Sequence, residues 1–339
     1  MGDLKEAVLW NAAEGGKARC RLCNHRCLVP DNGVGVCRVR KNVGGRLYSL
    51  NYGKAVSVAV DPVEKKPFFH WFPGTRVYSF AAAGCNFKCE GCQNWQISQG
   101  EIAGEELPPE EIAGEAVRAQ ARGVAYTYTE PTVFFEYATD TAKLAKKKHL
   151  YNVFVTNGYM TPEAIREMGD IDASRIDLKF MDERLYATYC RAKGYEHVLE
   201  SIRLLHGKGH VEVVNLVIPT LNDGEDSFRA VARFVADLDA DIPLHFIAFY
   251  PANRATGIPP TGVKSLERAR QIAMGEGVRY AYVGNVPGHP GENTYCPGCG
   301  EPVIERYGFL VTAYRLGRDH RCPKCGFLVK IWDDSNYRL

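Results

Sequence analysis

The sequence predicts an α/β protein: a partial barrel of about six strand–helix repeats, with a cysteine-rich N-terminal extension and a C-terminal zinc ribbon. From residue 77 onward, apolar segments of strand length alternate with segments of helical spacing, and parallel strands need crossovers of this length. The 12 cysteines sort into groups of four, three and four with one left over, which is typical of metal sites in a reducing compartment. We therefore expect three domains, spanning residues 1–73, 74–288 and 289–339.

The N-terminal extension contains four cysteines in the turn-rich string CRLCNHRCLVPDNGVGVC. Four soft ligands in a short segment predict a closed metal site, with zinc favoured over a second iron–sulfur cluster. Four unligated thiols are the weaker alternative, because exposed free cysteines are a liability. The proposed ligands are Cys20, Cys23, Cys27 and Cys37.

Residues 43–60 follow as a hairpin pair, because Gly44-Gly45 is a turn signal and the flanking residues alternate. The next string, DPVEKKPFFH, is polar and then aromatic, and we expect a connector that leads to the barrel. Lys65 and Lys66 within it could face an anionic substrate group, although we favour a solvated pair.

The barrel itself is expected to place its chemistry at the carboxyl ends of its strands. Helix starts such as Pro108-Pro109 and helical apolar spacing separate the helices from the strands. The predicted strands span residues 77–83, 124–128, 151–156, 175–178, 211–218, 244–249 and 280–283. The predicted helices span residues 110–122, 132–148, 162–168, 197–206, 227–238 and 264–274.

The string GCNFKCEGCQNW follows the first barrel strand and holds Cys85, Cys89 and Cys92 in a C-x3-C-x2-C pattern. A cubane iron–sulfur cluster normally takes four cysteines, so three would leave one iron open for chemistry. Gly84 and Gly91 would let backbone N–H groups approach the cluster sulfurs. Buried structural thiols or a zinc knuckle are the alternatives, and zinc would need a fourth ligand far away in sequence.

This spacing resembles the signature of the radical S-adenosylmethionine (SAM) superfamily. The resemblance implies a [4Fe–4S] cluster whose open iron chelates SAM, and a 5'-deoxyadenosyl radical that abstracts a hydrogen from the substrate. The superfamily usually has an aromatic residue before the third cysteine to seat the adenine. Gly91 stands there in this chain, so we expect adenine stacking to come from elsewhere.

The resemblance also assigns SAM contacts at the strand ends. Glu130-Pro131 matches the second half of a motif that binds the SAM amino group, with Thr129 beside it, although Glu130 could merely cap the following helix. Thr156 and Asn157, in the string TNG, match a turn of the glycyl-radical-enzyme activases.

Asp177 and Lys179, in DLK, match an activase motif whose lysine reaches the SAM carboxylate. A surface ion pair is their alternative. His245 corresponds to a histidine near the SAM ribose, and a satisfied core histidine is its alternative. Cys190, outside every group, is expected to be a buried inert thiol, and a hydrogen-atom donor in radical chemistry is its minor alternative. No catalytic residue beyond these ligands is predicted.

The C-terminus carries two C-P-x-C-G knuckles around a strand-rich segment, residues 303–316. The glycine after each second cysteine permits a tight turn, and the pair predicts a zinc ribbon, with rubredoxin-type iron as the second choice for the metal. We expect the ribbon to brace the fold. The predicted ligands are Cys296, Cys299, Cys322 and Cys325.

Over its whole length the chain resembles the radical SAM member of the AmmeMemoRadiSam system, a relative of the pyruvate formate-lyase activases. Besides the cysteine strings, YTEPTVFFEY, VTNGY, DLK and VGNVPGHPGENTYCPGCG carry this resemblance. It implies an enzyme acting on an unidentified small molecule, with a low-potential electron donor such as a flavodoxin or ferredoxin. The alternatives are an activase that installs a glycyl radical on a partner protein, and a metal-stabilised module that binds RNA or protein.

The net charge and the hydropathy of the sequence limit the classes of partner that we expect. The formal net charge of +2 gives no electrostatic case for nucleic acid or membrane. No apolar run approaches the length of a membrane span, and the start MGDLKEAVLW lacks the basic and apolar regions of a signal peptide. We therefore expect a cytoplasmic protein that does not bind a membrane. Nucleic acid is also a disfavoured partner.

Overall fold

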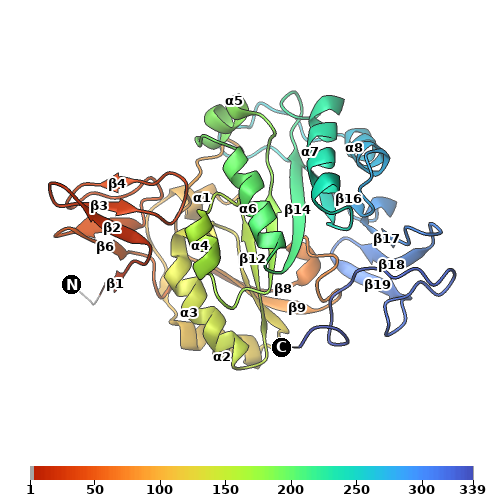
Figure 1. Ribbon diagram of the computed structural model, residues 1–339, viewed down its shortest axis with the longest axis horizontal. Helices are drawn as coiled ribbons and strands as arrows, with labels where there is room; N and C mark the ends of the chain where they lie inside the picture. Colours follow the sequence, from red (N-terminus) through yellow and green to blue (C-terminus); the bar gives the residue numbers. More distant parts are fainter. Residues whose placement is uncertain (1–3, 339) are drawn as a thin grey trace.

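The computed structural model describes residues 4–338, so the first three residues of the predicted extension and the last residue of the predicted ribbon lie outside it. Its centre is an eight-stranded sheet in the order β16-β15-β14-β13-β12-β11-β9-β8 (Figure 1). β8 pairs antiparallel with β9, and every other neighbouring pair is parallel. The α/β class with a mostly parallel sheet is therefore confirmed. The strands are β8 (Ser57–Pro62), β9 (Arg76–Ala81), β11 (Gly123–Tyr126), β12 (Tyr151–Thr156), β13 (Ala173–Asp177), β14 (His210–Val217), β15 (Leu244–Ala248) and β16 (Ala281–Gly284).

Helices connect the parallel strands and cover the outer face of the sheet (Figure 1). Because both faces are covered, the strands read as continuous apolar runs, and all six residues of β12 are buried. The predicted helix at residues 132–148 begins as a short 3-10 turn, η2 (Pro131–Phe134). No helix among residues 4–338 is long and apolar enough to cross a membrane. The helices are α1 (Trp95–Gln99), α2 (Pro109–Arg118), α3 (Phe135–Lys146), α4 (Pro162–Glu167), α5 (Glu183–Leu185), α6 (Glu196–His206), α7 (Glu225–Leu238) and α8 (Val263–Gly275).

The inner face of the sheet is filled by residues 61–72, which are the last two residues of β8 and the segment after it, and which we call the floor segment. Phe68, Trp71 and Phe72 are buried against the inward residues of β9, β11, β12 and β13. This segment is therefore more than the predicted connector, because it fills one end of the barrel and leaves the carboxyl ends of the strands open.

The N-terminal lobe (residues 4–55) consists of two small antiparallel sheets, at the left in Figure 1. The hairpin predicted in residues 43–60 is confirmed for β5 and β6, which turn at Gly44 and Gly45 with φ of 60° and 84°. The last part of that range is β8, which instead joins the large sheet as its edge strand. The lobe's strands are β1 (Lys5–Glu6), β2 (Trp10–Ala13), β3 (Lys17–Cys20), β4 (Leu28–Val29), β5 (Arg40–Val43), β6 (Arg46–Ser49) and β7 (Lys54–Ala55), which pairs with β10 (Glu105–Glu106).

A buried ion pair joins the N-terminal lobe to the helical layer. The Arg40 guanidinium donates to both carboxylate oxygens of Glu136 in α3, at 2.6 Å each, and neither side chain is more than 2% exposed. Glu136 also accepts a hydrogen bond from the Val8 backbone N–H at 2.7 Å.

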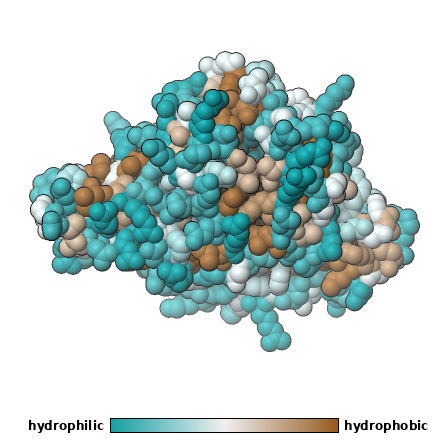
Figure 2. All heavy atoms as spheres, turned by 45° about the horizontal axis from the view of Figure 1, so that its top comes forward, coloured by the Kyte–Doolittle hydropathy of each residue, from teal (hydrophilic) through white to brown (hydrophobic). Residues whose placement is uncertain are grey.

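The C-terminal segment forms a three-stranded antiparallel sheet, β17 (Thr294–Tyr295), β18 (Pro302–Tyr307) and β19 (Leu310–Tyr314), at the right in Figure 1. Its apolar residues share one cluster with Phe69, Tyr280 and Tyr282, so it packs on the filled end of the barrel. Exposed apolar side chains occur on this sheet and on the N-terminal lobe (Figure 2).

Candidate active site

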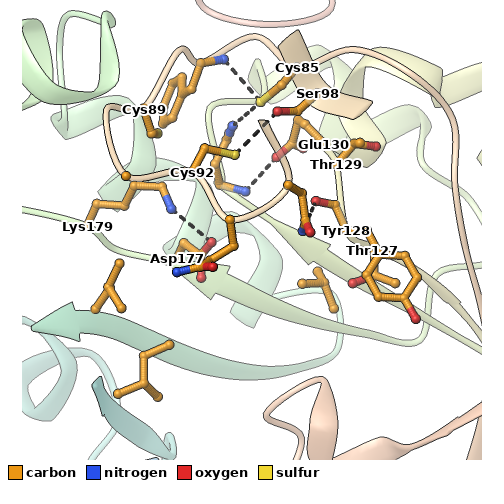
Figure 3. A pocket seen from close by; sticks show the side chains of 18 of the residues that line it. Cys85, Cys89, Cys92, Ser98, Thr127, Tyr128, Thr129, Glu130, Asp177 and Lys179 are labelled. Carbon is orange, nitrogen blue, oxygen red and sulfur yellow. Dashed lines mark hydrogen bonds and ion pairs between the residues drawn. The ribbon is translucent and has the colours of Figure 1, made fainter. Parts of the chain in front are cut away.

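A cavity of about 630 Å³ lies at the carboxyl ends of the strands, where the loop between β9 and α1 borders it (Figure 3). We call residues 82–94 the cluster loop. The cavity brings together nine of the residues predicted for cofactor or metal binding: Cys85, Cys89, Cys92, Thr129, Glu130, Thr156, Asn157, Asp177 and Lys179.

Local contacts hold the thiols of the cluster loop. The Phe87 backbone N–H donates to Cys85 Sγ at 3.3 Å, and Cys92 Sγ lies 3.4 Å from Ser98 Oγ (Figure 3). Gly84 has φ of 104°, and a Cβ there would lie 2.7 Å from Cγ1 of Val39 in the N-terminal lobe. The loop therefore needs glycine where it meets that lobe.

The three thiols of the cluster loop line one cavity but are not one of the compact groups that could hold a single metal ion. Among residues 4–338, the one group of three or more His, Cys, Asp or Glu ligand atoms that all lie within 4.8 Å of one another is at the C-terminus. One zinc ion would require such a tight group, whereas the cysteines of a cubane cluster bind different irons and lie further apart. The donor set therefore fits a cluster of several irons.

Gly91, between Cys89 and Cys92, is needed because two aromatic side chains approach it. A Cβ at this position would clash with the Tyr189 hydroxyl and lie 2.8 Å from Cε2 of Phe249. Both rings also line the cavity. Sequence reasoning missed both residues, because neither lies in a motif and each comes from a distant part of the chain.

Cys190 lies directly behind the cluster loop, in the π-helical turn Tyr186–Cys190. It is fully buried, as expected. A hydrogen bond from the Cys190 thiol lowers the pKa of Cys89 to about 7, and the Lys179 ammonium acts in the same direction. Burial disfavours the charged form of Lys179, but the charge of the neighbouring Cys89 thiolate outweighs it and raises the pKa of Lys179.

Glu130 is a buried carboxylate at the cavity wall. Its Oε1 accepts hydrogen bonds from Thr132 N–H at 3.0 Å, from the Thr132 hydroxyl at 2.6 Å and from the Thr156 hydroxyl at 2.7 Å. Its Oε2 accepts one, from Asn157 N–H, at 2.7 Å. The bond from Thr132 N–H caps η2, as the alternative interpretation held. Burial raises the pKa of Glu130 although these donors oppose the rise.

Thr129 and Asn157 tie the strand ends to the cluster loop. Tyr128 has φ of 63°, which turns the chain so that the Thr129 hydroxyl donates to the Ala82 carbonyl at 2.7 Å. The Asn157 side-chain amide donates to Oδ1 of Asn86 at 2.7 Å. These bonds fix the loop relative to β11 and β12.

The Lys179 ammonium lies 3.1 Å from Oδ2 of Asp177 (Figure 3). Arg175 pairs with the same carboxylate. The Lys179 side chain is 18% exposed and that of Asp177 is 29% exposed. The two residues face the cavity, so they are not the solvated surface pair that was their alternative.

Comparison with known proteins identifies the family. A model described as the Radical SAM superfamily matches residues 81–235, which include the cluster loop and the ends of β11, β12 and β13. The chain belongs to the radical SAM superfamily. It is a radical SAM enzyme, and such enzymes use a [4Fe–4S] cluster and SAM together with an electron donor and a substrate.

Relatives span most of the chain. An uncharacterized protein of Methanocaldococcus jannaschii, MJ0808, is 43% identical over 334 residues, which cover 97% of this chain and 99% of that protein. The pyruvate formate-lyase 1-activating enzyme of Escherichia coli K12 is 24% identical over 220 residues, which cover 59% of this chain and 89% of the relative. A crystal structure of a radical SAM methyltransferase from Sphaerobacter thermophilus gives a TM-score of 0.49 at 16% identity and covers 64% of this chain and 70% of that one.

The bottom of the radical SAM cavity is lined by Lys65 and Lys66 of the floor segment. Both ammonium groups lie 2.7 Å from the Asp61 carboxylate, and that of Lys66 is 4.1 Å from the centroid of the Tyr128 ring. The side chain of Lys65 is 43% exposed and that of Lys66 only 3%. The interpretation as a solvated pair is therefore wrong for Lys66, whose pKa is lowered by burial to about 8.

His245 is not among the residues that line the cavity. It is at the start of β15, and its Nε2 is 2.7 Å from Oε2 of Glu212, which is fully buried. The ring stacks on Tyr282 with centroids 4.9 Å apart. Glu212 also accepts hydrogen bonds from the backbone N–H groups of Phe69 and His70. These contacts are those of a core histidine that connects β14 and β15 to the floor segment.

The C-terminal cysteines form a second site, away from the cavity. Their four sulfur atoms all lie within 4.8 Å of one another. Gly300 and Gly326 follow the knuckles with φ of 74° and 75°, and their N–H groups donate to the backbone carbonyl oxygens of Cys296 and Cys322. The predicted four-cysteine site is therefore present and could hold one metal ion. The N-terminal cysteines lie apart from it, in the N-terminal lobe.

Proposed function

We propose that this enzyme cleaves SAM reductively in the cavity and uses the 5'-deoxyadenosyl radical to abstract hydrogen from a small-molecule substrate. Cys85, Cys89 and Cys92 would hold three irons of the [4Fe–4S] cluster and leave the fourth to SAM. When bound, the cluster supplies the single electron that breaks the sulfonium bond. The observation that carries the proposal is that three thiols, which do not form a compact single-ion group, line one cavity with a buried carboxylate and a paired lysine.

Glu130 is suited to receive the amino group of SAM. A carboxylate has about four acceptor positions, divided between its two oxygens. Oε2 accepts one hydrogen bond, from Asn157 N–H, whereas the other three go to Oε1. The remaining position could accept from an ammonium group, and such a charge would offset the burial that raises the pKa of Glu130. Thr156 would position the carboxylate and Thr129 would position the strand end against the cluster loop.

Lys179 is suited to receive the SAM carboxylate. Its ammonium is held by Asp177 on one side and lies near the Cys89 thiol, so it stays charged in a partly buried site. The aromatic surface for adenine would come from Tyr189 and Phe249, which take the place usually filled by the residue at Gly91.

We also propose the subgroup, the domain division and the C-terminal metal of this enzyme. The sequence strings support membership of the AmmeMemoRadiSam group, and the three-domain division at residues 73 and 288 remains our working description. Zinc is the metal we propose for the C-terminal site, because four thiols within 4.8 Å suit tetrahedral coordination. An activase that acts on a glycine of a partner protein is the second candidate, supported by the similarity to the pyruvate formate-lyase 1-activating enzyme.

Reductive SAM cleavage tests the proposed function. Protein reconstituted anaerobically with iron and sulfide should form 5'-deoxyadenosine and methionine when reduced, and a Cys85→Ala variant should form neither. A Cys325→Ser variant is the matched control, because it loses a thiol of the other site. Absence of 5'-deoxyadenosine from iron-loaded wild type would overturn the proposal. A stable organic radical on an added glycyl-radical enzyme would favour the activase.

A further inference from the structure

The four N-terminal cysteines converge in the N-terminal lobe. Cys20 ends β3 and its backbone N–H bonds to the Cys27 carbonyl at 2.9 Å, and Cys37 precedes β5. Cys20, Cys23 and Cys37 are buried, whereas Cys27 is partly exposed. The backbone N–H of Val36 donates to Cys27 Sγ at 3.5 Å, as amides do to metal-bound thiolates.

The spacing of these thiols differs from that of the C-terminal site in the same chain. Throughout residues 4–338, ligand atoms of three or more such side chains meet within 4.8 Å at the C-terminal cysteines alone. No three of the N-terminal thiols therefore have the spacing that one tetrahedral ion imposes. In this they match the cluster loop, whose thiols bind separate irons in radical SAM enzymes.

The N-terminal cysteine group also touches the cluster loop at two points. His25, between Cys23 and Cys27, places its Nε2 2.7 Å from the carbonyl oxygen of Asn86, the residue after Cys85. On the other side, a Cβ at Gly84 would lie 3.1 Å from the carbonyl oxygen of Cys37. In each contact, both residues lie within two positions of a cysteine of their own segment. The His25–Asn86 hydrogen bond and a few covalent bonds therefore connect the N-terminal cysteines to those of the cluster loop.

The outer edge of the group reaches the surface. Cys27 is partly exposed, and Leu28, Val34 and Val36 beside it are 43%, 47% and 39% exposed (Figure 2 shows exposed apolar residues on this lobe). The inner edge is buried against the cluster loop. The group therefore lies between the protein surface and the cluster loop.

We propose that Cys20, Cys23, Cys27 and Cys37 hold a second iron–sulfur cluster, which passes electrons from a protein donor to the cluster at Cys85, Cys89 and Cys92. This inference rests on the proposed function for its electron acceptor. A low-potential flavodoxin or ferredoxin would give up one electron and be oxidised, and the cluster held by the four N-terminal cysteines would accept that electron. That cluster would then pass the electron to the one held by Cys85, Cys89 and Cys92 and return to its oxidised state, so no proton is needed.

Metal content tests the second cluster without any activity measurement. A Cys85→Ala/Cys89→Ala/Cys92→Ala variant, reconstituted with iron and sulfide, should retain about four iron atoms per chain and an EPR signal when reduced. Adding Cys23→Ser and Cys37→Ser to that variant should remove this iron. If the triple variant holds no iron but about two zinc ions per chain, the N-terminal site is a zinc site and the proposal is wrong.

The electron path needs a second comparison. A Cys23→Ser/Cys37→Ser variant should form 5'-deoxyadenosine like wild type with dithionite but lose most of this activity with reduced flavodoxin. His25→Ala, which removes the bond to Asn86 and no thiol, should slow only the flavodoxin reaction. Equal rates of wild type, Cys23→Ser/Cys37→Ser and His25→Ala with flavodoxin would contradict the proposed electron transfer through the N-terminal cluster. If wild type fails to cleave SAM with dithionite, the proposed function fails, while the iron measurement still decides the second cluster.

Discussion

Replacing Arg40 by methionine should destabilise the protein strongly, because it leaves the Glu136 carboxylate charged and buried. Arg40 makes two hydrogen bonds of 2.6 Å to that carboxylate, and the two side chains are 1% and 2% exposed. Removing one partner of such a pair typically costs about 3–5 kcal/mol. This is a large part of the roughly 5–15 kcal/mol by which domains are stable.

The assay is urea unfolding of the reconstituted proteins under anaerobic conditions, with iron and zinc measured in the same samples so that metal loss is separated from the loss of the pair. Arg118→Met is the matched control, since its pair with Glu115 is 64% and 43% exposed and solvent screening leaves such a pair little effect on stability. Arg40→Met/Glu136→Gln should recover part of the loss, because the amide oxygen can still accept from Val8 N–H. A cost below about 1 kcal/mol for Arg40→Met, or no recovery in the double variant, would refute the reasoning.

Three further outcomes are expected. Glu64 is buried, and burial raises its pKa to about 7. The folded protein therefore holds this proton more tightly than the unfolded chain does, so the contribution of Glu64 to stability is present below about pH 4.5 and is lost as the pH rises through 7. Glu64→Gln should flatten the fall in the urea midpoint between pH 5 and 8, and an unchanged pH profile would contradict this. Gly91→Ala should lower the free energy of unfolding by about 1–3 kcal/mol and weaken SAM binding in a calorimetric titration. Gly257→Ala is the control and should change neither quantity, because a Cβ there meets no atom within 4 Å. Equal effects of the two substitutions would argue against the packing of Tyr189 and Phe249 around Gly91. Cys322→Ser should release about one metal ion per chain and expose the C-terminal sheet to proteolysis, and full retention of the metal would rule out a four-thiol site.

The cysteines and the strand–helix alternation could be predicted from sequence because their signals are local. Spacing alone locates the cluster loop and the C-terminal knuckles, and the apolar runs locate most strands of the parallel sheet. Helix ends were less well defined. The helix predicted for residues 110–122 ends at Arg118, because Gln120 takes a positive φ of 54°.

What sequence reasoning missed depends on contacts between distant segments. Nothing in DPVEKKPFFH shows that its aromatic residues fill the barrel or that Lys66 is buried at the cavity floor. The same limit applies to Tyr189 and Phe249, whose approach to Gly91 exists only in the folded chain. His245 lies at the start of its strand, and that end of the sheet is closed by the floor segment.

The most direct test of an incompletely ligated iron that faces SAM is EPR spectroscopy of the reduced, iron-loaded protein with and without SAM. We expect SAM to shift one cluster signal, and we expect this SAM-sensitive signal to be absent from Cys85→Ala. A spectrum that is the same with and without saturating SAM, in protein whose cluster loop carries its full iron, would contradict the account.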